Sequence, residues 1–234
     1  MGISPARAQL DRLWRRGRAF LGVDVAIMGG AMTWVSERHL VAAISNAGGF
    51  GVIASGSMNP QQLAAEIGGA QALTRKPFGV NLITMHPQLL ELIDACLALK
   101  VGHIVLAGGV PTREAIRRVK DGGAKCVCFA PALVIARKLL KSGADALVIE
   151  GHEAGGHVGP VTTAVLAQEI LPVVTEAPVF VAGGIGRGEA IVSYLEMGAS
   201  SSAIVTDVKA CVHYERLEIL LVNSTLDLFE NPKA

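Results

Sequence analysis

Short apolar runs alternate with longer amphipathic segments along most of the chain. The runs are nearly continuous in hydrophobic residues, which is typical of strands buried on both faces of a parallel sheet. Seven runs are clear, and an eighth, Ser202–Val205, is weaker. The clear runs are Val23–Met28, Gly51–Ala54, Phe78–Ile83, His103–Ala107, Lys125–Ala130, Asp145–Ile149 and Val179–Ala182.

Each run is followed by a segment that predicts a helix. Ser36 is expected to cap the first of these helices, and Pro60 stands where proline is favoured, at the first helical position of the second. The predicted helices are Glu37–Asn46, Pro60–Leu73, Pro87–Lys100, Thr112–Asp121, Ala132–Ser142, Thr163–Leu171, Arg187–Met197 and Asp207–Asn223.

This regular alternation predicts an α/β protein built as a (β/α)8 TIM barrel. Strand starts recur at roughly 20 to 30 residues, which suits one strand and one helix per repeat. Right-handed connections would close eight such units into a barrel. The eighth unit and the C-terminus look shortened. A doubly wound open sheet is the alternative, and no linker divides residues 23–234, so we expect a single domain there.

The first 22 residues differ from the rest in composition. Residues 1–21 carry five arginines and one aspartate, as a transit peptide could. However, Leu10, Leu13, Trp14 and Phe20 recur near helical spacing. We therefore expect residues 1–22 to form an amphipathic helical cap that covers the bottom of the barrel.

Composition narrows the possible partners. Apolar residues make up 51% of the chain and charged residues 18%, which indicates a well-buried aliphatic core. The net charge of +1 and the aromatic content of 4% argue against nucleic acid or an anionic membrane as a partner. No apolar run approaches the ~18 residues of a membrane span. The four cysteines lack metal-ligand spacing, so we expect free thiols and a cytoplasmic location.

The richest candidate for chemistry is Glu150–Gly159, which follows the sixth predicted strand. It holds four glycines, two histidines and two glutamates in ten positions. Glycines let a backbone lie close to a flat ligand, and the carboxyl ends of parallel strands carry the active sites of barrels. Histidine moves protons near neutral pH, which makes His157 and His152 candidates. A simple glycine-rich turn is the alternative.

Three other features belong to the same predicted end of the barrel. The glycine-rich stretch 182–188 follows the seventh strand and opens a helix, where a phosphate can bind, although a tight turn would look similar. Asn81 places an amide inside an apolar strand, where it would bond a heterocycle or a neighbouring loop. Met32 and Trp34 could lie against an aromatic ligand or fill the barrel mouth. No metal-ligand cluster or nucleophile elbow is evident, so redox chemistry would need an organic cofactor.

The chain resembles the nitronate monooxygenase family, formerly called 2-nitropropane dioxygenases, and the related flavin-dependent enoyl-ACP reductases. The Glu-Ala-Gly-Gly-His string at 153–157 is the most specific element of this resemblance. The matching stretches occur in family order and are Gly30–Ser36, Ser45–Gly51, Lys76–Leu82, Glu150–Gly159 and Ala182–Ile185.

The resemblance implies that residues 23–234 form an FMN-binding TIM barrel with the flavin at its carboxyl end. His157 matches the family's catalytic histidine. Asn81 would contact the isoalloxazine ring, Glu150 stands where many members have glutamine, and Gly184 would approach the phosphate. The full set of implied cofactor-binding residues is Ala31, Met32, Asn81, Glu150, Gly155, Gly183 and Gly184, with no metal.

Three departures from the family pattern bear on this expectation. Gly29 replaces the usual glutamine, and Ala31 replaces the second glycine of the first motif. A Gln-x-Gly-Thr-Arg segment that contributes to the family's phosphate site is missing near Val205, and the chain stops at Ala234. These departures predict weaker FMN binding.

Three functions remain open at this stage. The first is an FMN-dependent monooxygenase that oxidises alkyl nitronates or nitroalkanes with oxygen. The second is a flavin-dependent enoyl-ACP reductase that uses NAD(P)H and an enoyl thioester. The third is a barrel that no longer binds flavin. The sequence also leaves open whether the protein forms a homo-oligomer.

Overall fold

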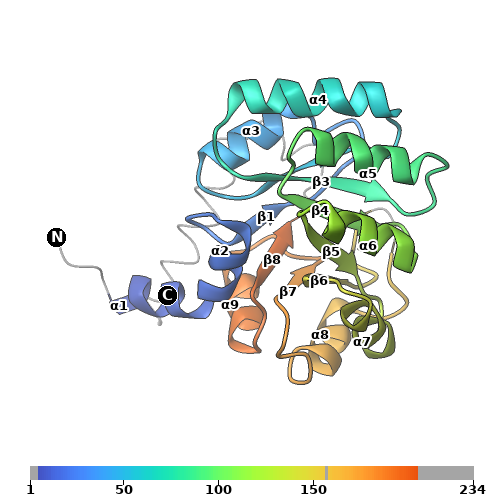
Figure 1. Cartoon of the computed structure of the whole chain (residues 1–234). Coiled ribbons are helices and arrows are strands. Elements are labelled where there is room, and N and C mark those ends of the chain that lie inside the picture. The colour runs from blue at the N-terminus through green and yellow to red at the C-terminus, as the bar shows by residue number, and fades with distance from the viewer. Residues whose placement is uncertain (1–4, 156–157, 205–234) are drawn as a thin grey trace.

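A computed structural model describes residues 5–155 and 158–204 of the chain. Its centre is a single eight-stranded parallel sheet with helices around the outside (Figure 1). The strands are β1 (Ile27–Gly29), β2 (Gly51–Ala54), β3 (Phe78–Ile83), β4 (His103–Ala107), β5 (Lys125–Phe129), β6 (Ala146–Glu150), β7 (Val179–Ala182) and β8 (Ser201–Ile204).

The sheet closes on itself. Its hydrogen-bonded order is β1-β8-β7-β6-β5-β4-β3-β2, so β1 pairs with β8. On its other side β1 meets β2 through a short bridge, in which the Gly29 N–H donates to the Phe50 carbonyl at 2.9 Å. The Phe50 N–H donates in turn to the Ile27 carbonyl, also at 2.9 Å. The predicted TIM-barrel fold is confirmed.

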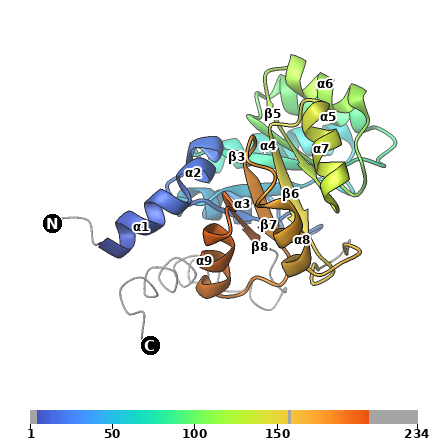
Figure 2. The same cartoon turned by 90° about the horizontal axis from the view of Figure 1, so that it is seen from below.

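Nine helices lie within the described residues, and most of them follow a strand. In Figure 2 the helices after β2 to β7 surround the barrel. The bounds are α1 (Pro5–Leu13), α2 (Arg15–Leu21), α3 (Arg38–Asn46), α4 (Pro60–Leu73), α5 (Leu89–Ala98), α6 (Arg113–Asp121), α7 (Leu133–Lys141), α8 (Thr163–Ile170) and α9 (Gly188–Glu196). The helix predicted over residues 207–223 lies outside the described part of the chain.

Strand alternation divides the hydrophobic residues into two layers. One cluster joins the outward-facing residues of the strands, such as Leu82 and Ile149, to the helices. A second cluster fills the barrel interior with residues such as Phe50, Val148 and Phe180. Because side chains alternate along a strand, Glu150 shares the interior face with Val148. By the same rule Asn81 faces away from the outer layer that holds Leu82.

Helix α2 covers the amino-terminal end of the barrel. The Phe20 carbonyl accepts a hydrogen bond from His103 Nε2 at 2.9 Å and another from Lys125 Nζ, the first residues of β4 and β5. The Phe20 ring lies 5.3 Å from the His103 ring and 6.0 Å from that of Phe180. Where one amphipathic helix was predicted, the described residues form two, α1 and α2, and Trp14, which separates them in the chain, is fully buried.

Two local predictions were wrong. Ser36 does not cap α3, because its hydroxyl donates to the Gly30 carbonyl (2.8 Å) and accepts from the Met32 N–H (2.9 Å). Glu37 caps the helix instead, and its carboxylate accepts two backbone N–H groups. The first strand is also shorter than predicted. The Val25 N–H donates to the Gly48 carbonyl rather than to a neighbouring strand.

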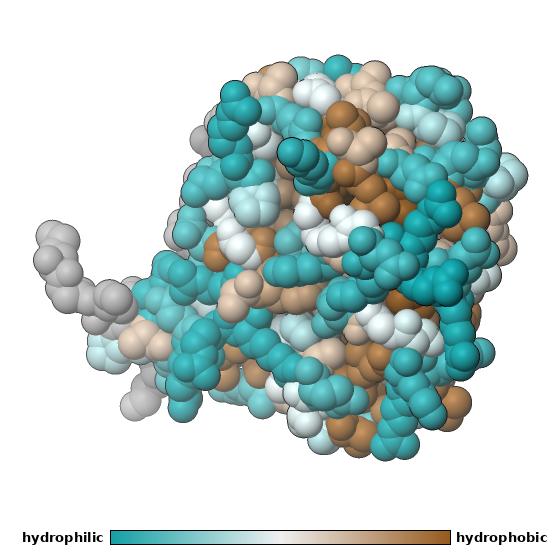
Figure 3. Space-filling view, viewed as in Figure 1, coloured by the Kyte–Doolittle hydropathy of each residue, from teal (hydrophilic) through white to brown (hydrophobic). Residues whose placement is uncertain are grey.

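The outer surface is mixed in character. Hydrophilic residues cover much of the face shown in Figure 3, and hydrophobic residues are visible between them in its upper middle and again in its lower part. None of the described helices combines the length and the hydropathy needed to cross a bilayer.

Candidate active site at the carboxyl end of the barrel

Glu150 and Asn81 bring polar side chains to the carboxyl half of the barrel. Asn81 is 6% exposed, and its amide has no hydrogen-bond partner among the described residues. Its backbone carbonyl is used, since it accepts from the Ser55 hydroxyl at 2.7 Å. The buried side-chain atoms that lack a partner within the described residues are Ser200 Oγ and Ser201 Oγ, so the polar atoms of the Asn81 amide remain accessible from the barrel mouth. Asn81 therefore has hydrogen-bonding capacity left for a ligand.

Glu150 ends β6 and faces a cavity of about 250 Å³. Burial raises the pKa of its carboxyl to about 7, and no described residue forms an ion pair or hydrogen bond with its side chain. Near neutral pH this carboxyl can therefore donate or accept a proton. The other residues that line the cavity are small or apolar: Gly108, Gly109, Val110, Phe129, Ala130, Pro131, Val158 and Gly159.

The loop that follows β6 is held in a compact shape. The Gly159 N–H donates to the Gly151 carbonyl at 3.1 Å, and the His152 N–H donates to the Val161 carbonyl at 2.9 Å. At Gly159 a Cβ atom would lie 2.3 Å from the Glu150 carbonyl oxygen, so no other residue fits there without a shift. This close approach explains the glycine at position 159.

Glu153 anchors the same loop to the start of α8. Its carboxylate accepts the Thr163 N–H at 2.8 Å and the Thr163 hydroxyl at 2.9 Å. The first of these bonds lowers the pKa of Glu153. Thr163 is 1% exposed, so Glu153 attaches the loop to a residue that is buried in the protein interior. Glu153 is therefore a structural residue of the loop, a role that sequence reasoning did not assign.

The loops after β6 and β7 are in contact. Gly183 and Gly184 both have positive φ angles, of 93° and 71°. A Cβ atom at Gly183 would lie 3.1 Å from the Ala154 nitrogen, and one at Gly184 would lie 3.0 Å from the Glu153 Cβ. The two glycine-rich segments singled out in the sequence therefore pack against each other at one end of the barrel.

Helix α9 begins just beyond these glycines. It starts at Gly188, and Arg187 at its N-cap supplies no side-chain hydrogen bond. The first N–H groups of this helix consequently have no side-chain acceptor, a situation that favours an anion. Gly186 has open space where a side chain would stand. These features fit the phosphate of a nucleotide cofactor.

The other predicted residues lie at the same end of the barrel but do not line the 250 Å³ cavity. Ala31 and Met32 follow β1 and are half-buried, and Gly155 is exposed in the loop after β6. Trp34 is 83% exposed, so it does not fill the barrel mouth. His157, the predicted catalytic residue, lies outside the described residues.

Some lining residues of the cavity were missed by sequence reasoning. Phe129 was treated only as part of an apolar run, yet it forms one wall beside Glu150. The signal was its place at the carboxyl end of β5, in phase with the interior residue Val127. Alternation along the strand therefore identifies it once the barrel is assumed.

A family profile matches most of this chain and identifies the family to which it belongs. The profile of the nitronate monooxygenase family matches residues 16–98 and 91–213. The chain therefore belongs to the nitronate monooxygenase family, a family of flavin-dependent oxidoreductases.

Curated relatives include two kinds of oxidoreductase. A (3aS,4S,5R,7aS)-5-hydroxy-7a-methyl-1-oxo-octahydro-1H-indene-4-carboxyl-CoA dehydrogenase of Mycobacterium tuberculosis is 36% identical over 80% of this chain and 53% of its own length. A probable nitronate monooxygenase of Staphylococcus aureus is 29% identical over 80% of this chain and 66% of its own. The chain thus spans roughly half to two thirds of the curated relatives that it matches.

Solved structures of FabK and of a nitroalkane oxidase have a fold similar to that of this chain. FabK from Thermotoga maritima is similar with a TM-score of 0.78 and 36% identity, covering 81% of this chain and 60% of FabK. A nitroalkane oxidase from Streptomyces ansochromogenes has a TM-score of 0.71 and 28% identity, covering 80% of this chain and 66% of its own.

Proposed function

We propose that this chain forms the barrel of an FMN-dependent oxidoreductase that oxidises alkyl nitronates or nitroalkanes. The observation that carries the proposal is the Asn81 side chain, which has no hydrogen-bond partner within residues 5–155 and 158–204, in a residue 6% exposed in the carboxyl half of a barrel from this family. Family membership supports the reaction class, and the open start of α9 supports a phosphorylated cofactor.

Each implied residue has a defined task in this proposal. Asn81 would bond the polar edge of the flavin ring, and Gly183 and Gly184 would keep side chains away from its phosphate. Glu150, with its raised pKa, would offer a proton or a hydrogen bond at the ring. His157 would remove the α-proton from a neutral nitroalkane. The bound flavin would accept electrons from the substrate and pass them to oxygen.

Binding is tested by titrating the protein with FMN and following the flavin absorbance bands. Asn81→Ala should weaken FMN binding by about tenfold, because a lost hydrogen bond in a buried site costs about 1.5 kcal/mol. Gln61→Ala removes an exposed amide on α4 and serves as the matched control. A protein that stays colourless at saturating FMN would contradict the proposed cofactor.

A second candidate reaction is reduction or dehydrogenation of a thioester. The 36% identity to a carboxyl-CoA dehydrogenase and to FabK, against 29% and 28% for the nitronate monooxygenase and the nitroalkane oxidase, favours it. Mixing the flavin-loaded protein anaerobically with NADH and, separately, with propyl 2-nitronate distinguishes the two. Bleaching by NADH supports thioester reduction, and bleaching by the nitronate alone supports nitronate oxidation.

His157→Ala tests the predicted base. The variant should bind FMN normally and lose oxidation of neutral nitroethane while retaining oxidation of the preformed nitronate, which needs no proton removal. Oxygen uptake with each substrate measures the difference. Unchanged turnover of nitroethane would remove His157 from the mechanism.

A further inference from the structure

A second and larger cavity lies at the opposite end of the barrel. It has a volume of about 550 Å³, within the range of small-molecule sites. The segments before β3 and β4, the first residues of β3, β4 and β5, and the end of α2 form its walls. It therefore faces away from Glu150 and the proposed flavin site, and the proposed reaction does not involve it.

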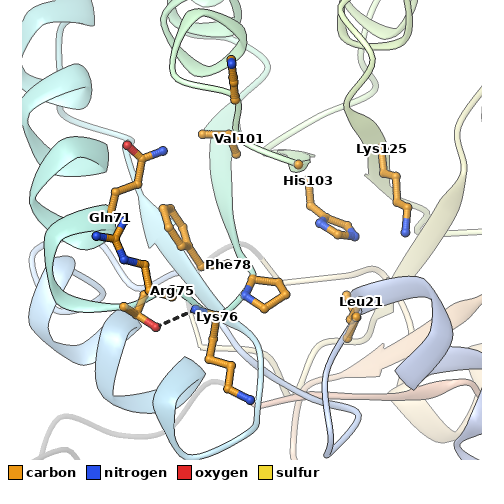
Figure 4. Close-up of a pocket in the computed structure, with 13 residues that line it drawn as sticks. Leu21, Gln71, Arg75, Lys76, Phe78, Val101, His103 and Lys125 are labelled. Carbon is orange, nitrogen blue, oxygen red and sulfur yellow. Dashed lines mark hydrogen bonds between the residues drawn. The ribbon is translucent and has the colours of Figure 1, made fainter.

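Four cationic side chains line this cavity, and none of its described lining residues is acidic. They are Arg75, Lys76, Lys100 and Lys125. In Figure 4, Arg75 and Lys76 stand on one side of the hollow and Lys125 on the other, beyond His103. Like charges gathered around one space raise its positive potential and attract anions.

Little of this charge is neutralised by the surrounding protein. Lys76 Nζ lies 3.5 Å from Asp24 Oδ2, but both side chains are mostly exposed, so the pair is weak. Lys125 donates to the uncharged Phe20 carbonyl. Arg75 and Lys100 have no ion pair or side-chain hydrogen bond within residues 5–155 and 158–204, which leaves both free to bind a ligand.

Apolar residues form much of the remaining wall of the cavity, together with Gln71 and Thr74. Phe78 is half-buried, and in Figure 4 its ring lies next to Arg75, whereas Leu21 lies on the opposite side of the hollow, below His103 and Lys125. Burial lowers the pKa of His103 to about 4, so this histidine stays neutral and adds no charge to the wall. The cavity therefore combines a cationic rim with an apolar surface that suits a ring.

We propose that this amino-terminal cavity binds a phosphorylated ring compound of nucleotide size. Arg75 and Lys100 would bind the phosphate groups, since guanidinium and ammonium groups form strong charge-assisted bonds to phosphate oxygens. Phe78 and Val101 would contact the ring. The site is independent of the proposed flavin chemistry, and its ligand would be a second small molecule bound about one barrel length from the reaction.

Calorimetric titration with ADP and with sodium pyrophosphate tests this proposal at constant ionic strength. ADP should bind saturably and more tightly than pyrophosphate, because only ADP offers a ring to Phe78. The double variant Arg75→Gln/Lys100→Gln should lose about tenfold or more in ADP affinity. The matched control is Lys138→Gln/Lys141→Gln, which removes two exposed charges from α7 and should bind ADP as the wild type does.

Four results would overturn the proposal. The first is no saturable binding of either probe. The second is an equal loss of ADP affinity in both double variants, which would indicate unspecific attraction to positive charge. The third is a lower melting temperature in Arg75→Gln/Lys100→Gln with unchanged ADP affinity, which would mean that these cations only stabilise the carboxyl ends of α4 and α5. The fourth is pyrophosphate binding as tight as that of ADP, which would exclude the ring contact.

Discussion

Replacing Glu150 by glutamine should stabilise the protein at alkaline pH and leave it unchanged at acidic pH. The carboxyl is partly buried at the end of β6, without a partner among the described residues, and its pKa is raised to about 7. Its ordinary value is 4.5. The folded state therefore binds the proton more tightly than the unfolded chain does, and ionisation of Glu150 disfavours folding.

The expected magnitude follows from this difference in pKa. A shift from 4.5 to about 7 corresponds to at most about 3 kcal/mol. Because Glu150 keeps some contact with solvent, we discount this to about 2 kcal/mol. The contribution of the neutral Glu150 carboxyl to the free energy of unfolding is fully present below pH 4.5 and is lost as pH rises through about 7. For a chain of this size, 2 kcal/mol corresponds to about 4 to 8 °C in melting temperature.

Thermal unfolding of wild type and Glu150→Gln between pH 4 and pH 9 measures the effect. The two melting temperatures should agree near pH 4, diverge between pH 4.5 and pH 7 with the glutamine variant higher, and keep a constant difference above about pH 8. Glu169→Gln, an exposed site on α8, controls for a general change in net charge. If the curves of wild type and Glu150→Gln run parallel across this range, then the carboxyl is not desolvated and our account of the cavity is wrong.

Three further changes test other parts of the fold. The pKa of His103 is lowered to about 4 by burial, so the wild type should lose up to about 3 kcal/mol as pH falls from 6.5 to 4, and His103→Gln should flatten this dependence in urea unfolding. Gly51→Ala should destabilise the protein by about 2 kcal/mol, because the new Cβ would lie 2.4 Å from the Val41 carbonyl oxygen. Gly68 has open space around it, so Gly68→Ala should be neutral or stabilising in the same assay. Trp34 has a φ of 68°, a backbone conformation that asparagine tolerates better than tryptophan, and its side chain is 83% exposed. Trp34→Asn should therefore raise the free energy of unfolding by about 1 kcal/mol in chemical denaturation. A decrease would show that the indole makes stabilising contacts.

The barrel could be predicted because its strands carry a strong local signal. Strands buried on both faces are almost entirely apolar, so β2, β3, β4 and β7 have the predicted bounds. The capping of α3 could not be predicted. The Ser36 hydroxyl is used by the loop after β1, and this contact depends on how the loop folds back rather than on the residues next to the helix.

The candidate site was predictable only in part. Glu150 and Asn81 were identifiable as polar residues at or near strand ends, but the wall formed by Phe129 requires knowing which face of β5 points inward. The amino-terminal cavity left no local signal at all. Arg75, Lys100 and Lys125 belong to three separate segments, and each alone looks like an ordinary surface cation.

The shared acceptor at Phe20 has a consequence for how the protein assembles during synthesis. The imidazole and the ammonium group that bind this oxygen follow it by 83 and 105 positions along the chain. Helix α2 thus leaves the ribosome well before its docking site exists. The Phe20 ring stays exposed to solvent until β4 and β5 have been synthesised. A chaperone that shields this helix would act in that interval.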